Sequence, residues 1–123
     1  MFDIYINTHF SAGHHLRDYP GNCEHPHGHN WNVKVTVRAT ELDTLGMGID
    51  FRVLKMAVAT VMETLDHRDL NTHPSFQLLN PSSENIAVYI FDSLKSVLVS
   101  DRYRVHCITV EETPGSGVTY FGS

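Results

Sequence analysis

The chain has 123 residues, 41% of them apolar, and a formal net charge of −5 at pH 7. This length and apolar content predict a single domain over residues 1–123 with one core. The sequence has no apolar run long enough to cross a bilayer, and its acidic balance argues against sequence-independent binding to nucleic acid. It lacks a secretory leader pattern and has two cysteines, so we expect a cytoplasmic protein without a disulfide.

The first half of the chain predicts two strands and a helix. Apolar and polar residues alternate from Phe2 to Phe10 and again from Trp31 to Arg38, which is the period of a strand. Asp50 then precedes apolar residues at three- and four-residue spacings from Phe51 to Leu65. This pattern predicts an amphipathic helix with Asp50 as its N-cap.

The second half predicts a loop, a helix and two strands. Residues 66–81 are polar and form the loop, and a helix with a serine cap is expected to start near Ser82-Ser83-Glu84, with an apolar stripe from Ile86 to Val97. Strands are expected at 104–112 and 118–121, joined by a Pro-Gly turn. The order ββααββ predicts an α+β fold, a four-stranded antiparallel sheet with two helices on one face. Its exposed edges favour pairing with other subunits.

Histidine is the compositional outlier, with nine residues in the chain and five of them between positions 14 and 29. His27 and His29 are two apart, so on a strand their imidazoles project from one face. A catalytic zinc takes three protein ligands, and His14 or His15 could supply the third where the first strand ends. Two alternatives stay open: solvated surface histidines, or a structural zinc with Cys23 as fourth ligand. The ligand spacing argues against the structural site.

Five motifs in the chain resemble those of the 6-pyruvoyltetrahydropterin synthase superfamily. They are "FSAGHHL" (10–16), "CEHPHGH" (23–29), "LDHRDLN" (65–71), "NPSSEN" (80–85) and "EET" (111–113). They follow one another in order along essentially the whole chain. Within the superfamily the sequence is most similar to the 6-carboxytetrahydropterin synthase branch, which serves queuosine and 7-deazapurine biosynthesis. The resemblance implies the T-fold.

The resemblance also implies a set of site residues. Zinc would be held by His14, His27 and His29, with His14 selected over His15 by the F-x-A-x-H motif. The catalytic residues would be Cys23, Asp66 and His67, and the pterin would be bound by Glu112, Ser82 and Ser83. Candidates for the phosphate contacts are Arg17, Lys34, Arg38 and Arg68, since Glu111 stands where many relatives carry lysine.

The implied reaction converts 7,8-dihydroneopterin triphosphate to 6-carboxy-5,6,7,8-tetrahydropterin, releasing acetaldehyde and triphosphate. Three residues separate Cys23 from the H-G-H, as in the carboxy-forming branch, whereas the pyruvoyl-forming enzymes usually have five. The alternatives are 6-pyruvoyltetrahydropterin synthase, which eliminates triphosphate without carbon–carbon cleavage, and a non-catalytic zinc- or pterin-binding protein. The implied assembly is a homohexamer of two trimers with active sites between subunits.

Overall fold

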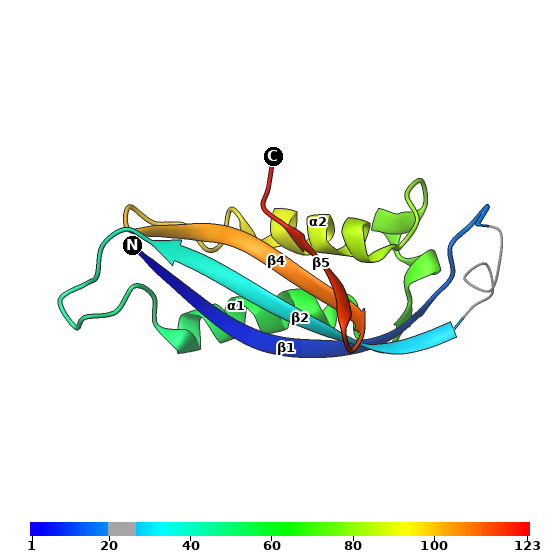
Figure 1. Ribbon diagram of the computed structural model, residues 1–123, viewed down its shortest axis with the longest axis horizontal. Coiled ribbons are helices and arrows are strands. Elements are labelled where there is room, and N and C mark those ends of the chain that lie inside the picture. Colours follow the sequence, from blue (N-terminus) through cyan, green and yellow to red (C-terminus); the bar gives the residue numbers. More distant parts are fainter. Residues whose placement is uncertain (20–26) are drawn as a thin grey trace.

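The computed structural model describes residues 1–19 and 27–123, with residue 27 described by its backbone alone. Its elements are β1 (Phe2–His14), β2 (His27–Ala39), α1 (Phe51–Glu63), β3 (Arg68–Asp69), two 3₁₀ turns η2 (Leu70–Thr72) and η3 (Pro74–Phe76), α2 (Ser83–Leu94), β4 (Tyr103–Thr113) and β5 (Ser116–Tyr120). The strands form one sheet in the order β3-β1-β2-β4-β5 (Figure 1). The α+β class is confirmed.

The sheet has a fifth strand that the periodicity did not predict. β3 pairs in parallel with β1, Ala12 opposite Arg68, so the sheet is mixed rather than purely antiparallel. Two contacts with Ser11 hold this segment at the edge of β1: the Ser11 N–H donates to Asp66 Oδ1 at 2.8 Å, and the His67 N–H donates to the Ser11 carbonyl at 2.6 Å. A strand of two residues is too short to show a period, so the sequence read as a loop there.

Both helices lie on the same side of the sheet (Figure 1). Each begins where predicted: Asp50 accepts a hydrogen bond from the Arg52 N–H, and Ser82 from the Asn85 N–H. Each predicted apolar stripe includes one exposed residue at its end, Phe51 at the start of α1 and Val97 after α2. Phe51 is 55% exposed and Val97, beyond the end of α2, is 62% exposed, because neither position faces the sheet.

Two stacked aromatic rings form the core beneath one end of the sheet. Phe10 and Trp31 are paired residues of β1 and β2, both fully buried, with parallel rings whose centroids are 5.8 Å apart. The Trp31 indole N–H donates to the Ala12 carbonyl at 3.3 Å, which satisfies its buried polar group. This pair gives the end of the sheet a rigid floor.

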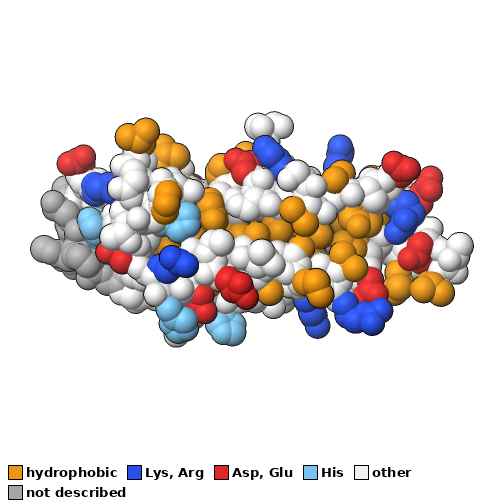
Figure 2. All heavy atoms as spheres, turned by 180° about the vertical axis from the view of Figure 1, so that it is seen from behind, with side chains coloured by type: hydrophobic (Ala, Val, Ile, Leu, Met, Phe, Trp, Pro, Cys, Tyr) orange, Lys and Arg blue, Asp and Glu red, His pale blue; other side chains and the backbone are white. Residues whose placement is uncertain are grey.

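Seen from the side opposite to Figure 1, apolar side chains form a band along the middle of the molecule (Figure 2). Val53, Met56 and Ala57 of α1 line an open groove together with Val97 and Leu98. Within the described ranges, no helix combines the length and apolar character needed to cross a membrane.

Candidate metal centre

The ladder between β1 and β2 brings two of the predicted ligands together. Ala12 lies opposite His29, and His14 opposite residue 27, so His14 and His29 are diagonal neighbours on adjacent strands. Their ring centroids are 5.5 Å apart, and each ring stands edge-on to Trp31. His14 is 3% exposed. The pairing register therefore fixes the two imidazoles against the aromatic floor.

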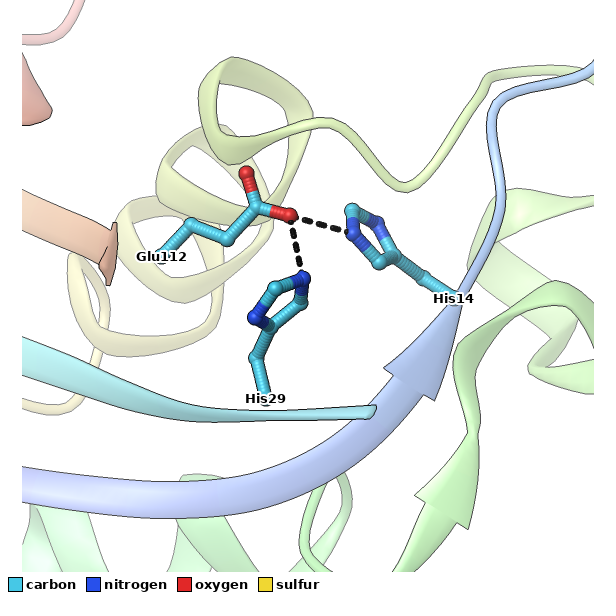
Figure 3. Close-up of side chains that lie close together, drawn as sticks. All are labelled: His14, His29 and Glu112. Atoms are coloured by element: carbon cyan, nitrogen blue, oxygen red, sulfur yellow. Dashed lines mark hydrogen bonds and ion pairs between the residues drawn. The ribbon is translucent and has the colours of Figure 1, made fainter. Parts of the chain in front are cut away.

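Glu112 joins the two histidines from β4. β4 pairs with β2, with Glu111 opposite Asn32, and the next residue along β4 reaches the histidines. The Oε1 atom of Glu112 lies 2.7 Å from His14 Nε2 and 2.8 Å from His29 Nε2 (Figure 3). Within the described part of the chain, these three residues form a group whose ligand atoms all lie within 4.8 Å of one another. Two imidazoles and a carboxylate are a donor set that suits zinc.

A backbone carbonyl orients His14. Its Nδ1 lies 2.7 Å from the oxygen of Pro81, just before α2, and a ring N–H at this atom can donate to that carbonyl. The same arrangement, with Nδ1 protonated, turns the Nε2 lone pair toward His29 and Glu112. His14 thus fits a metal ligand: its Nδ1 bonds the Pro81 carbonyl, and its Nε2 faces His29 and Glu112.

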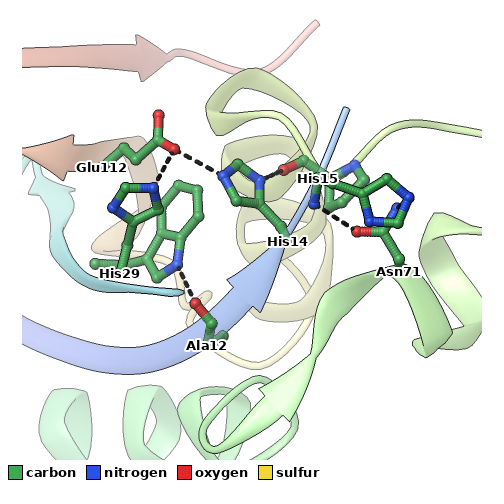
Figure 4. Close-up of polar contacts among 8 residues, drawn as sticks. Ala12, His14, His15, His29, Asn71 and Glu112 are labelled. Carbon is green, nitrogen blue, oxygen red and sulfur yellow. Dashed lines mark hydrogen bonds and ion pairs between the residues drawn. The ribbon is translucent and has the colours of Figure 1, made fainter. Parts of the chain in front are cut away.

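His15 belongs to a different set of contacts. Its backbone N–H donates to Asn71 Oδ1 at 2.9 Å, and its ring nitrogen Nε2 lies 3.5 Å from Asn71 Nδ2 (Figure 4). Of the two adjacent histidines, the structure brings His14 together with His29 and Glu112. The period of the strand left this choice open, and only the family motif selected His14.

Two predicted site residues cannot be placed. Cys23 lies outside the described residues, and residue 27 is described only as the backbone partner of His14 in the ladder. The predicted thiol and the third histidine ligand therefore stay predictions.

Asp66 and His67 sit at a sharp turn held by β1. Their side chains are 3.5 Å apart between Asp66 Oδ2 and His67 Nε2. His67 has a φ of 55°, a left-handed conformation that is uncommon for residues other than glycine. The hydrogen bonds of Ser11 with the Asp66 carboxylate and the His67 N–H maintain this turn, and it leaves the imidazole 82% exposed. The dyad predicted from the motif has its carboxylate and imidazole adjacent.

A hollow of about 400 Å³ lies beside the dyad, on the face of the sheet opposite to the metal group. Its wall includes His67 and Arg68 together with Ser11 and Asn30, whose side chains are hydrogen-bonded to each other. Gly28 also lines it, and a Cβ at that position would meet nothing within 4 Å. Because residues alternate between the two faces of a strand, Gly28 and Asn30 face this hollow, whereas the ring of His29 faces Trp31 and Glu112 on the other side of the sheet.

Sequence reasoning missed how closely α2 approaches the metal group. Ser82 caps α2 and Ser83 is its first residue, directly after the Pro81 carbonyl that bonds His14. Both serines are half-buried. It also did not place Glu112 against the histidines; the only signal was that the ends of β1 and β4 and the start of β2 share one end of the sheet.

The sequence matches the family described as 6-pyruvoyl tetrahydropterin synthase over residues 3–123. It is 37% identical to a putative 6-pyruvoyl tetrahydrobiopterin synthase of Caenorhabditis elegans, over 92% of this chain and 89% of that protein. It is 33% identical to the 6-carboxy-5,6,7,8-tetrahydropterin synthase of Bacillus subtilis, over 97% and 84%. The solved structure of a C. elegans 6-pyruvoyl tetrahydropterin synthase superposes with a TM-score of 0.89 at 34% identity, covering 99% of this chain and 96% of that one.

Proposed function

Because the chain belongs to the 6-pyruvoyl tetrahydropterin synthase family, whose enzymes act on pterins, we propose that it is a zinc-dependent lyase that converts 7,8-dihydroneopterin triphosphate to 6-carboxy-5,6,7,8-tetrahydropterin. Acetaldehyde and triphosphate leave, and the product feeds queuosine and 7-deazapurine biosynthesis. The observation that carries the proposal is the convergence of His14, His29 and Glu112 at one end of the sheet.

Of the three converging residues, we assign His14 and His29 to the metal, with His27 as the third ligand that the family motif implies, and leave Glu112 for the pterin. Zinc bound there supplies a Lewis acid for the hydroxyl oxygens of the substrate side chain. Pro81 keeps His14 in the tautomer that this role needs, and the Trp31 floor limits the movement of both described rings. A small displacement of either ring would therefore require repacking of the core.

Glu112 would bind the pterin ring through its N–H groups. Its side chain is 32% exposed, and its second oxygen points away from the two histidines (Figure 3). A carboxylate that accepts two hydrogen bonds fixes the ring in one orientation. Ser82 and Ser83, at the start of α2 beside Pro81, would border the same ring.

Cys23, Asp66 and His67 would move the protons. Asp66 Oδ2 lies 3.5 Å from His67 Nε2, so the carboxylate can orient the imidazole for proton transfer with carbon or oxygen of the substrate. Cys23, as a thiolate, would be the base that removes protons from the substrate side chain.

The carboxy product is supported by the three residues between Cys23 and the H-G-H. The alternative is 6-pyruvoyltetrahydropterin synthase, a name that the C. elegans relative carries at a similar level of identity. Purified protein incubated with zinc and dihydroneopterin triphosphate separates the two by mass spectrometry. Acetaldehyde together with the carboxy product supports the proposal, and a pyruvoyl product alone contradicts it.

A non-catalytic zinc- or pterin-binding protein is the remaining alternative. Cys23→Ala tests it together with the metal assignment: we expect zinc to stay near one per chain while turnover falls at least about 100-fold, the usual contribution of a positioned acid or base. Loss of zinc would show that Cys23 is a ligand. Full turnover would remove it from the proton transfers.

We further propose a cytoplasmic homohexamer of two trimers with sites between subunits. β3 and β5 are the outer strands of the sheet, and β3 covers only two residues of β1, so most of the β1 edge faces outward within the described chain. Open edges of this kind can pair with another subunit. Light scattering in solution should give six times the chain mass of 13.9 kDa.

A further inference from the structure

The motif "NPSSEN" begins and ends with an asparagine, and neither of these residues has a role in the proposed reaction. Asn80 stands directly before Pro81, whose carbonyl oxygen lies 2.7 Å from His14 Nδ1. The pyrrolidine ring of a proline fixes its backbone angle φ. A displacement of Asn80 is therefore passed on to the Pro81 carbonyl and to its contact with His14.

The side chain of Asn80 holds the backbone three residues after His14. Its Oδ1 accepts from the Arg17 N–H at 3.0 Å, and its Nδ2 donates to the Arg17 carbonyl at 3.2 Å. A carboxamide carries an acceptor and a donor side by side, so it can bond both backbone groups of one residue. Asn80 and Pro81 thus hold the chain that leaves β1 at two points, one of them the ring of His14.

Asn85 ties the backbone of Asn80 to the first turn of α2. Its Nδ2 donates to the Asn80 carbonyl at 2.9 Å. The guanidinium of Arg17 adds two bonds to the same connection, donating to the carbonyls of Phe76 and Leu79 at 2.6 and 2.8 Å. Asn80 is therefore fixed both to the chain after β1 and to the helix, and Pro81 lies between these two attachments.

We propose that Asn80 is a positioning residue of the metal centre, an inference that rests on the proposed function. By holding the Pro81 carbonyl at His14 Nδ1, it keeps the Nε2 lone pair of His14 directed toward the metal. Asn80 acts through Pro81 rather than on the metal itself. A histidine whose outer N–H loses its acceptor is a weaker and less well oriented metal ligand.

The test has two readouts besides catalytic activity. Competition with a chromogenic chelator gives the zinc affinity, and the visible absorption of the cobalt-loaded protein reports how the ligands are arranged around the metal. Asn80→Ala should weaken zinc binding about 10-fold, the lower end of the effect for residues that support metal ligands, and should shift the cobalt spectrum. Asn85→Ala should change both values in the same direction but less, because it leaves the two bonds between Asn80 and Arg17 intact.

Asn71→Ala is the matched control. Asn71 is also half-buried, lies in the same connection between α1 and α2, and accepts from the backbone N–H of His15, the neighbour of His14 (Figure 4). This variant should melt at a lower temperature than the wild type while its zinc affinity and cobalt spectrum stay unchanged, because Asn71 does not hold Pro81.

Unchanged metal readouts in Asn80→Ala overturn the inference, as does an equal change in Asn71→Ala. If Asn80→Ala does not fold, unchanged readouts in Asn85→Ala overturn it instead. In each of these cases the proposed function stands, because the wild-type protein still binds the metal. A wild-type protein that binds neither zinc nor cobalt refutes the proposed function, and this inference with it.

Discussion

Replacing His14 with alanine should release the metal, whereas the same change at His15 should leave it bound. The two histidines are adjacent in sequence, so the variants remove the same chemical group from neighbouring positions. His14 is buried against Trp31 and reaches Glu112 and His29, while the backbone and ring of His15 contact Asn71. Any difference in bound zinc between the two variants therefore comes from where the imidazole lies, because both variants lose the same chemical group.

The expected loss can be worked out from the ligand set. Zinc in a four-ligand site is held by about 10–16 kcal/mol, so one ligand contributes about 3 kcal/mol, which is about 100-fold in affinity. The change also leaves the buried carbonyl of Pro81 without its hydrogen bond from His14, which costs about 1–3 kcal/mol of folding stability. His14→Ala should thus lose zinc and melt at a lower temperature than His15→Ala.

Zinc per chain, measured by mass spectrometry after dialysis against a weak chelator, gives the first readout. Circular dichroism confirms that each variant is folded at the temperature of the assay. A folded His14→Ala protein that keeps one zinc per chain would refute the assignment of His14. Loss of zinc from His15→Ala alone would mean that the neighbouring ring is the ligand.

Three further changes test the fold by urea or thermal unfolding. Gly48→Ala should destabilise the protein by about 1–3 kcal/mol, because the new Cβ would stand 2.8 Å from that of Ala39; an unchanged urea midpoint would contradict this packing. Ser82→Ala should cost about 1 kcal/mol through the lost cap of α2, and a smaller loss than Asn gives at the same position would argue against capping. The hydrogen bond from Arg38 lowers the pKa of Asp3 from its ordinary 3.8, so the stability that Asp3 contributes is present above that pH and disappears as the pH falls through the lowered pKa. Asp3→Asn should therefore lower the melting temperature at pH 7 but not at pH 2, and an equal loss at both would refute the linkage.

The periodic parts of the molecule could be predicted because their signals are local. Alternation located β1 and β2, the cap at Asp50 located the start of α1 to the residue, and the serine cap located that of α2 within residues 82–84. The i, i+2 spacing also marked position 29 as a ligand candidate. Each of these signals depends only on the geometry of a few consecutive residues, and strands and helix caps have the same geometry in all proteins.

The contacts between distant segments could not be read from the sequence in the same way. The carbonyl of Pro81 that orients His14 is 67 residues away from it, and Glu112 is 98 residues away. β3 is held by hydrogen bonds of the Ser11 backbone with the Asp66 carboxylate and the His67 N–H. The residues of β3 show no periodic pattern that would predict a strand. The choice between His14 and His15 likewise needed the family motif, because adjacent residues at the end of a strand give no period.

The pairing of Ala12 with His29 has a consequence for how this protein can change during evolution. The ladder alone sets the separation of His14 and His29, so insertions or deletions between residues 15 and 26 leave the two rings in place, and lengthening a loop adds only a small entropic cost. A one-residue slip within either strand would instead turn a histidine to the other face of the sheet. Lineages are thus free to vary the length of the connecting segment around two histidines whose spacing the ladder fixes.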